Sequence, residues 1–309
     1  MAITVTTAPQ TTGPAARKAP RRRVRRRAWL TPTAFLVVPL ALLVTFTWVP
    51  VLTMFGYSLT TWNGLTPNPP FVGLDNYVEV FTRPELFAVL KVSLYYVGAS
   101  FVQIGLALYF ATVLSFKLRL RNLFKGILFF PYLINGVAIG MIFLYFFQPG
   151  GTLDATLGLI GLDGLSRHWL GDPDTINYSL AGTSIWRYLG LNFVMFLGAI
   201  QSIQPELFEA AELDGANRWQ RFRYLILPGI RPVIGLSFIL ALSGSLSVFE
   251  IPFIMTGGAN GSETFVIQTV NLAFKFHKFG LASAMAAILL VIVLLITWVQ
   301  RRLVPEDSP

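Results

Sequence analysis

Six long apolar runs constrain the fold of this chain more than any other feature of its sequence. Each run has about 20 residues or more, the length that an α-helix needs to cross the roughly 30 Å hydrocarbon core of a bilayer. Because lipid offers no hydrogen-bond partners to the backbone, such runs are expected to be helical. We therefore predict an all-α integral membrane protein with six transmembrane helices, at residues 33–57, 88–116, 123–147, 180–203, 229–255 and 280–300.

The composition supports this class and excludes several kinds of site. Only 13% of the residues are charged, whereas soluble domains carry about 25%. The chain contains no cysteine, which excludes a disulfide framework, a thiolate metal site and a cysteine nucleophile.

The positions of the basic residues predict the orientation of the spans. Residues 1–28 carry eight Lys and Arg and no acid, and we predict a disordered cytosolic tail that attracts anionic lipid. The alternatives for this tail are a nucleic-acid arm, which we disfavour, and a secretory signal, which lacks its cleavage site. With segments 115–126 and 203–231 and the pair Arg301 and Arg302, this side of the membrane holds 18 of the 24 basic residues. The positive-inside rule places these segments, both termini and the short tail 304–309 in the cytosol.

A polar segment at 204–228 separates the fourth and fifth predicted spans. Pro205 suits the first position of a helix, and Gly215 can end that helix. Asn217, with Gln220 three residues later, favours the start of a second helix. We predict two short helices with a bend between them, projecting from the membrane as a docking surface.

The same segment carries a spaced motif. It consists of Glu209, Ala210, Ala211, Asp214, Gly215, Ala216, Leu227 and Pro228. The motif closely resembles the EAA loop of permease subunits in binding-protein-dependent ABC importers, although Leu225 stands where the family prefers Ile. Residues 62–64, 71–77, 130–132, 169–173 and 254–258 are similar to the maltose-type sugar-importer branch, so the resemblance covers about residues 33–302.

The resemblance implies the fold, the location and the partners. It implies the type I ABC importer permease fold in the plasma membrane of a prokaryote, with the EAA loop inserted into a cleft on an ATPase subunit. The expected partners are a second homologous permease subunit, an ABC ATPase dimer, an extracytoplasmic solute-binding protein and membrane lipid, with no nucleic acid. The implied function is ATP-driven import of a sugar or oligosaccharide. Glycerol phosphate or another polyol-like solute is the alternative within the same class.

The sequence offers no catalytic site. It lacks a G-x-x-x-x-G-K-[ST] phosphate loop, so ATP and Mg are expected on a separate ATPase chain and no cofactor or metal on this one. His168 and His277 have no partner at ligand or triad spacing. We therefore predict a transport subunit and not an enzyme.

Polar groups within the predicted spans indicate where a substrate would pass, because such groups usually face a bundle interior or a cavity. From the residues alone the candidates are Tyr132, Asn135, Ser184, Tyr188, Asn192, Ser243, Ser245, Ser247, Phe249 and Glu250. Close helix packing is the alternative role for Ser243 and Ser247. The resemblance implies that Tyr132, Tyr188, Leu191, Ser245 and Val248 face a sugar. The fifth span carries Ser and Gly where the maltose-type branch is rich in Asn, which leaves the particular sugar open. Glu250 is expected at the exposed outer rim, and Arg187 is expected to extend to the interface.

Two other classes of protein remain as alternatives. A secondary transporter would show ionisable residues at mid-membrane and often inverted repeats, and the sequence shows neither clearly. A membrane scaffold would use the 204–228 protrusion only as a binding site.

Overall fold

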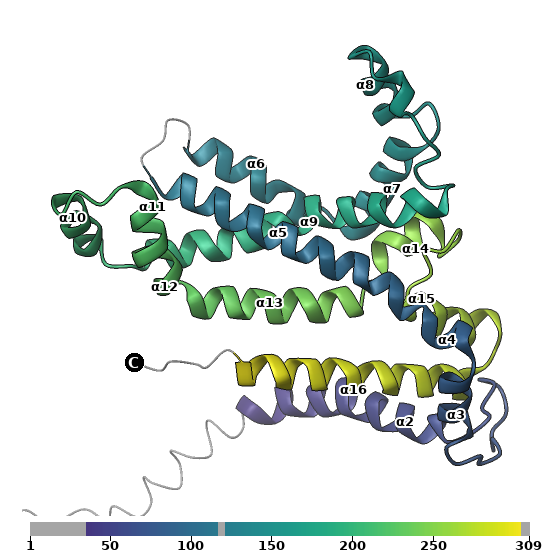
Figure 1. The fold of residues 1–309 in the computed structure, drawn as a ribbon. Coiled ribbons are helices and arrows are strands. Elements are labelled where there is room, and N and C mark those ends of the chain that lie inside the picture. The colour runs from purple at the N-terminus through teal and green to yellow at the C-terminus, as the bar shows by residue number, and fades with distance from the viewer. Residues whose placement is uncertain (1–34, 117–120, 304–309) are drawn as a thin grey trace, which may run out of the picture. The chain divides into compact units, whose positions relative to one another are not determined.

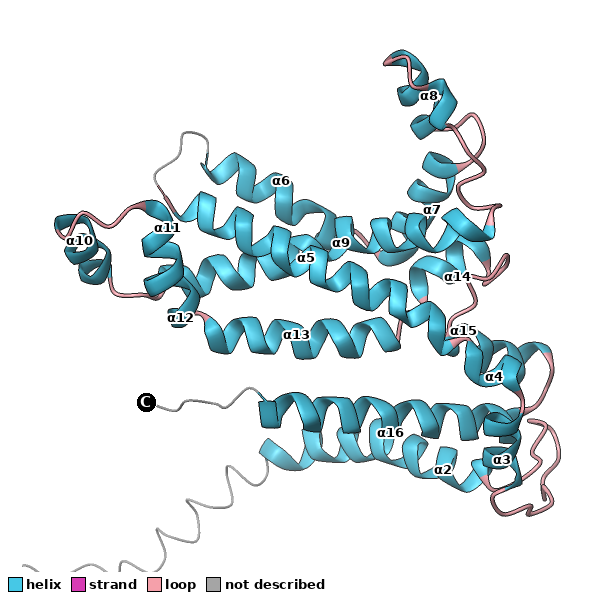
Figure 2. Cartoon of the chain, viewed as in Figure 1, coloured by secondary structure: helices cyan, strands magenta, loops and turns pink. Residues whose placement is uncertain are grey.

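The computed structural model describes residues 35–116 and 121–303, in a chain that divides into two compact units, 1–53 and 54–309. The described residues form helices and loops, and their one β-type pairing is an isolated bridge between Thr60 and Phe71 (Figures 1 and 2). The all-α prediction is confirmed for these residues. The predicted tails 1–28 and 304–309 lie outside them.

The first predicted span is a helix from Phe35 to Ser58. It contains a π-helical turn, η1 (Val44–Trp48), directly before α2 (Val49–Ser58). The Val49 N–H bonds to the Val44 carbonyl, five residues back. Pro50 lacks an N–H and its ring would clash with the carbonyl four residues earlier, so the wider turn accommodates it.

Four helices among the described residues are long and apolar enough to cross a membrane, or five if one bent pair is counted as a single span. The four are 35–58, 84–115, 231–256 and 279–302. The remaining predicted span, 180–203, lies in α9 (Pro173–Gln201), which is long enough at 29 residues but more polar. The α9 helix begins before the predicted span because the Asp172 side chain accepts the Asp174 N–H at 2.9 Å and Pro173 takes the first helical position.

The segment predicted as the third span is bent. It consists of α6 (Arg121–Leu133) and α7 (Gly136–Phe147), which meet at 98°. Pro131 interrupts the hydrogen bonding near the end of α6, and Asn135 has an extended ψ of 141°. The Asn135 side chain then caps α7 by accepting the Val137 N–H at 2.8 Å, so 123–147 is not one straight helix.

The segment predicted as the fifth span is also interrupted. The α13 helix (Arg231–Leu246) and the α14 helix (Glu250–Thr256) are separated by three non-helical residues, 247–249. The carbonyl of Val248 in this break accepts the Thr264 hydroxyl at 2.9 Å, which satisfies a backbone group that the helix would otherwise have bonded.

The helices α5 (Leu90–Ser115), α9 and α13 share one hydrophobic core. The α6 helix lies against α9, and the four helices run side by side in Figure 1. On α5 the core residues recur at helical spacing, as Ile104, Ala107, Ala111 and Leu114. A Cβ added at Gly190 of α9 would lie 2.5 Å from the Leu128 carbonyl oxygen, so this glycine permits the close approach of α6.

Two short helices, α3 (Asp75–Thr82) and α4 (Pro84–Ala88), follow the first helix. The Asn76 amide donates to the carbonyls of Ser58 and Thr60, both at 2.8 Å. This side chain therefore fixes α3 against the end of α2, which gives a physical role to one residue of the 71–77 segment.

The segment between α7 and α9 contains α8 (Thr152–Leu159) and η2 (Asp163–Leu165). Asp154 accepts the Gly150 N–H and the Trp169 indole N–H, both at 2.9 Å. Hydrogen bonding from the Ser166 side chain, and then from Trp169, lowers the pKa of Asp154 below its ordinary value. Beyond α14 the chain forms α15 (Phe265–Val270) and η4 (Asn271–Lys275), and the last span is α16 (Phe279–Leu303).

Candidate functional site

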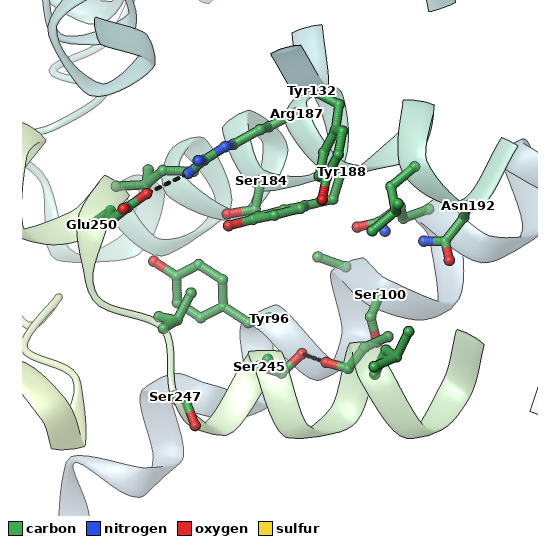
Figure 3. A pocket seen from close by; sticks show the side chains of 18 of the residues that line it. Tyr96, Ser100, Tyr132, Ser184, Arg187, Tyr188, Asn192, Ser245, Ser247 and Glu250 are labelled. Carbon is green, nitrogen blue, oxygen red and sulfur yellow. Dashed lines mark hydrogen bonds and ion pairs between the residues drawn. The ribbon is translucent and has the colours of Figure 1, made fainter. Parts of the chain in front are cut away.

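A cavity of about 640 Å³ with polar and apolar lining lies between α5, α6, α9 and α13, at the break before α14 (Figure 3). Its volume is within the range of small-molecule sites. Eight of the nine residues predicted for the substrate path line it: Tyr132, Ser184, Tyr188, Leu191, Asn192, Ser245, Val248 and Phe249. The ninth, Asn135, does not line the cavity, because its side chain caps α7.

One face of α9 supplies the largest share of the wall. Ser184, Tyr188 and Leu191 recur at intervals of four and three residues, which places them on the same side of the helix. The Ser184 hydroxyl donates to the Leu180 carbonyl at 3.2 Å, and the Ser245 hydroxyl of α13 donates to the Ala241 carbonyl at 2.7 Å. Because each serine hydroxyl donates its hydrogen bond within its own helix, its oxygen remains available as an acceptor for a ligand.

The α5 wall was missed at the sequence level. Tyr96, Ser100 and Gln103 line the cavity with the spacing of one helical face. Only 3% of Tyr96 is exposed, and its hydroxyl, which points into the cavity in Figure 3, has no hydrogen-bond partner among the described residues. The signal present in the sequence is the same as in the third, fourth and fifth predicted spans, namely polar side chains inside an apolar run.

An ion pair lies at the edge of the cavity. Arg187 Nη1 is 2.7 Å from Glu250 Oε2, and the guanidinium lies over the Tyr188 ring, 5.0 Å from its centroid. The Arg187 side chain, which can reach the interface from its place near the end of the span, is 13% exposed and points to Glu250. Glu250 is half exposed, at 51%, as expected for a rim position. The two residues are 63 positions apart, so no local pattern links them.

The 204–228 segment forms the two predicted helices, α10 (Pro205–Leu213) and α11 (Arg218–Arg221). Gly215 ends α10 with a left-handed φ of +75°. Its N–H bonds to the Glu212 carbonyl at 3.1 Å, and the Ala216 N–H bonds to the Ala211 carbonyl at 2.9 Å. This is a Schellman motif, which explains why glycine stands at this position of the loop.

Further contacts hold the two short helices together. Asn217 and Gln220 form a reciprocal capping box at the start of α11. Arg221 bonds to the Ala216 carbonyl at 3.0 Å and to the Glu212 carboxylate at 3.3 Å. After α11 the chain continues through η3 (Phe222–Ile226) and α12 (Leu227–Gly229), which contain Leu227 and Pro228 of the motif, directly into α13.

The two short helices present an open surface. Neither α10 nor α11 has a buried residue, and Glu209, Ala210 and Asp214 are exposed. Leu213 is 90% exposed, and Trp219 is exposed as well. An apolar side chain this open beside carboxylates is typical of a surface that contacts another protein.

Comparisons with known proteins agree with this geometry. Residues 103–306 match the family described as binding-protein-dependent transport system inner membrane component. The chain is 34% identical to the probable ABC transporter permease protein YurN of Bacillus subtilis, over 88% of this chain and 94% of that protein. It is 32% identical to the multiple sugar-binding transport system permease protein MsmF of Streptococcus mutans, over 91% and 97%. It is 31% identical to the diacetylchitobiose uptake system permease protein NgcF of Streptomyces coelicolor, over 84% and 78%.

Solved structures support the fold. The chain superimposes with a TM-score of 0.80 on a chain of a bacterial ABC transporter involved in the import of the acidic polysaccharide alginate, covering 93% of this chain and 99% of that one. The sequence identity is 24%, so this likeness concerns the fold alone.

Proposed function

Because this chain belongs to the family of binding-protein-dependent transport system inner membrane components, and is thus a membrane-embedded permease subunit and not an enzyme, we propose that it moves a sugar or oligosaccharide in an ATP-driven importer. The observation that carries the proposal is the cavity at the break between α13 and α14. Discontinuous membrane helices recur at transporter substrate sites because their freed backbone can line a polar cavity.

The side chains around the cavity suit a sugar. Sugar hydroxyls need donors and acceptors beside flat apolar surfaces. Tyr132 and Tyr188 supply two rings whose centroids are 6.4 Å apart, and Asn192 adds an amide with donors and an acceptor. MsmF is named for a multiple sugar-binding transport system, and NgcF is named for a diacetylchitobiose uptake system. Both relatives support the same substrate class for this chain.

The proposed assembly contains four kinds of protein. An extracytoplasmic solute-binding protein delivers the sugar, and a second, homologous permease subunit completes the path. An ABC ATPase dimer binds ATP and Mg, so this chain needs no cofactor of its own. The excess of basic residues in the cytosolic segments supports six spans with both termini and the 204–228 loop in the cytosol, where the ATPase is.

Coupling would follow the chain from the loop to the cavity. In this proposal Glu209 and Asp214 contact the ATPase, and the Schellman turn at Gly215 fixes the angle between α10 and α11. The path from α11 through η3 and α12 to α13 contains little non-helical backbone, so a displacement of the loop moves α13 as a unit. Ser245, near the far end of α13, lines the cavity, and the break at 247–249 lets α14 respond separately.

The test is the ATPase activity of the complete complex in lipid, with and without sugar-loaded binding protein. We expect the loaded binding protein to stimulate ATP hydrolysis in wild type. In Gly215→Asp we expect the stimulation to be lost, because an acidic side chain is added within the loop that contacts the ATPase. Transport that persists without ATP, or a complex that forms without an ATPase, would contradict the proposal and favour a secondary transporter. An ATPase that assembles but shows no sugar dependence would favour a scaffold.

A further inference from the structure

The Arg187–Glu250 pair determines which charge a substrate can carry. Resting on the proposed function, we infer that this chain's part of the path is electrically neutral and accepts uncharged sugars, while it rejects sugar acids and sugar phosphates. Among the described residues that line the cavity, Arg187 and Glu250 are the charged ones, and each neutralises the other at 2.7 Å.

The partly buried position of Arg187, whose side chain is 13% exposed, favours this neutralisation. A guanidinium that is removed from water without a counter-ion carries a large desolvation cost. Glu250 supplies the counter-ion, so no positive charge is left over for a carboxylate or phosphate on the substrate. An anionic ligand would lose hydration in the cavity without gaining a charged partner.

The pair is held in place from several sides. A Cβ added at Gly136, the first residue of α7, would overlap Glu250 Oε2 and lie 2.5 Å from Arg187 Nη1, so the α7 backbone lies against both charged ends. The start of a 12-residue helix also favours a nearby carboxylate. The Tyr188 ring covers the guanidinium at 5.0 Å. An entering anion would therefore meet a guanidinium that already has a counter-ion beside it.

The remaining polar lining is uncharged. Its side chains are hydroxyls and amides, namely those of Tyr96, Ser100, Gln103, Tyr132, Ser184, Tyr188, Asn192, Ser245 and Ser247. Such groups form hydrogen bonds with sugar hydroxyls, with Ser184 and Ser245 as acceptors, and they offer no countercharge.

The absence of cysteine from this chain allows a direct measurement of the charge. In a Ser245→Cys complex in lipid, the rates of modification by an anionic and a cationic methanethiosulfonate reagent are compared with the rates for a free thiol. Intact mass of this chain gives the readout, so cysteines of the partner chains do not interfere. We expect the normalised anion-to-cation rate ratio to be within about threefold of one, as at an uncharged site.

Variants of the pair report on this chain alone. In the same background, Glu250→Gln leaves Arg187 unpaired and is expected to raise the ratio by about tenfold or more. Arg187→Gln is expected to lower it by a similar factor, and the double variant is expected to restore it. The double variant also covers the case in which an unpaired charge prevents folding, because it has none. A parent ratio that already favours the anionic reagent tenfold, an unchanged ratio in Glu250→Gln, or no modification at position 245 would each overturn the inference.

Transport separates this inference from the proposed function. The wild-type complex is given β-1,4-mannotriose and its uronic acid counterpart, with other matched neutral and acidic pairs in parallel. Uptake of acidic and neutral members at equal rates would overturn the inference and leave the sugar importer intact. A complex that responds to no sugar, while the reagent ratios behave as expected, would reject the proposed function instead.

Discussion

Replacing Tyr96 by Phe removes a single oxygen from the cavity wall. This hydroxyl is buried and has no hydrogen-bond partner in the described ranges 35–116 and 121–303, and the whole residue is 3% exposed. A role in packing alone and a role in binding therefore predict opposite outcomes. If the hydroxyl serves only the fold, its removal relieves an unsatisfied polar group. If it serves the substrate, its removal deletes a hydrogen bond to a sugar hydroxyl.

The expected sizes follow from the two cases. A buried hydroxyl without a partner costs about 1–3 kcal/mol, so Tyr96→Phe is expected to leave the melting temperature unchanged or to raise it. A hydrogen bond to the substrate contributes about 0.5–1.5 kcal/mol net, which corresponds to a roughly 2- to 10-fold loss of sugar affinity. We expect both effects together: weaker binding in a protein that is no less stable.

The measurement uses equilibrium binding to the complex in lipid, with the sugar that stimulates its ATPase most, and thermal unfolding of the same preparation. Tyr95→Phe is the matched control, because Tyr95 lies outside the cavity, is 37% exposed and packs edge-on against Tyr178. We expect this control to change neither quantity. A Tyr96→Phe complex that melts lower and binds sugar normally would refute the reasoning, since the hydroxyl would then have a structural partner.

Three further predictions concern other parts of the chain. Gly215 has φ +75°, and a Cβ added there would have no atom within 4 Å. Gly215→Val is therefore expected to lose binding-protein stimulation of the ATPase through backbone strain of about 1–2 kcal/mol or more, and not through a clash. Gly215→Asn is expected to retain the stimulation, because asparagine tolerates this conformation. Gly190→Ala is expected to lower the free energy of unfolding by about 1–3 kcal/mol, as measured by thermal unfolding, because its Cβ would lie 2.5 Å from the α6 backbone. Gly198→Ala on the same helix, where a Cβ has open space, is expected to leave the free energy of unfolding no lower. Because the pKa of Asp154 is lowered, its hydrogen bond to Trp169 contributes fully to the stability of the fold above the ordinary Asp pKa and is lost as the pH falls through the lowered value. The ¹⁹F resonance of fluorinated Trp169 is expected to shift over that acid range. An identical shift in Asp154→Asn would contradict this.

Local patterns predicted the parts of the structure that local forces determine. The apolar runs gave the helix positions because lipid leaves the backbone no other way to satisfy its hydrogen bonds. Pro205, Gly215 and the Asn217–Gln220 pair predicted two short helices, since a first-position proline, a left-handed glycine and a capping box each act within a few residues.

The rest depends on contacts between distant segments. Arg187 is expected to reach the interface because it lies near the outer end of its predicted span, and only the fold brings Glu250 within 2.7 Å of it. Asn135 was assigned to the substrate path because it is a polar residue in an apolar run. The sequence does not show that Pro131 and Asn135 together end one helix and start another at 98°. The α5 wall carries the same signal, since Tyr96 is a polar residue in an apolar run, but only the fold shows that it lines the cavity.

The two helix breaks explain how polar groups can line the cavity of a membrane protein without a large free-energy cost. At each break the structure supplies side-chain hydrogen bonds in place of helical ones: Asn135 accepts from the Val137 N–H, and Thr264 donates to the Val248 carbonyl. These bonds limit the cost of non-helical backbone at membrane depth. Glu250 begins α14 directly after one break, and its carboxylate lies against Gly136, where α7 begins after the other. In the proposed coupling path, a movement of α13 that reaches the break at 247–249 would therefore reach the start of α14, where Glu250 pairs with Arg187.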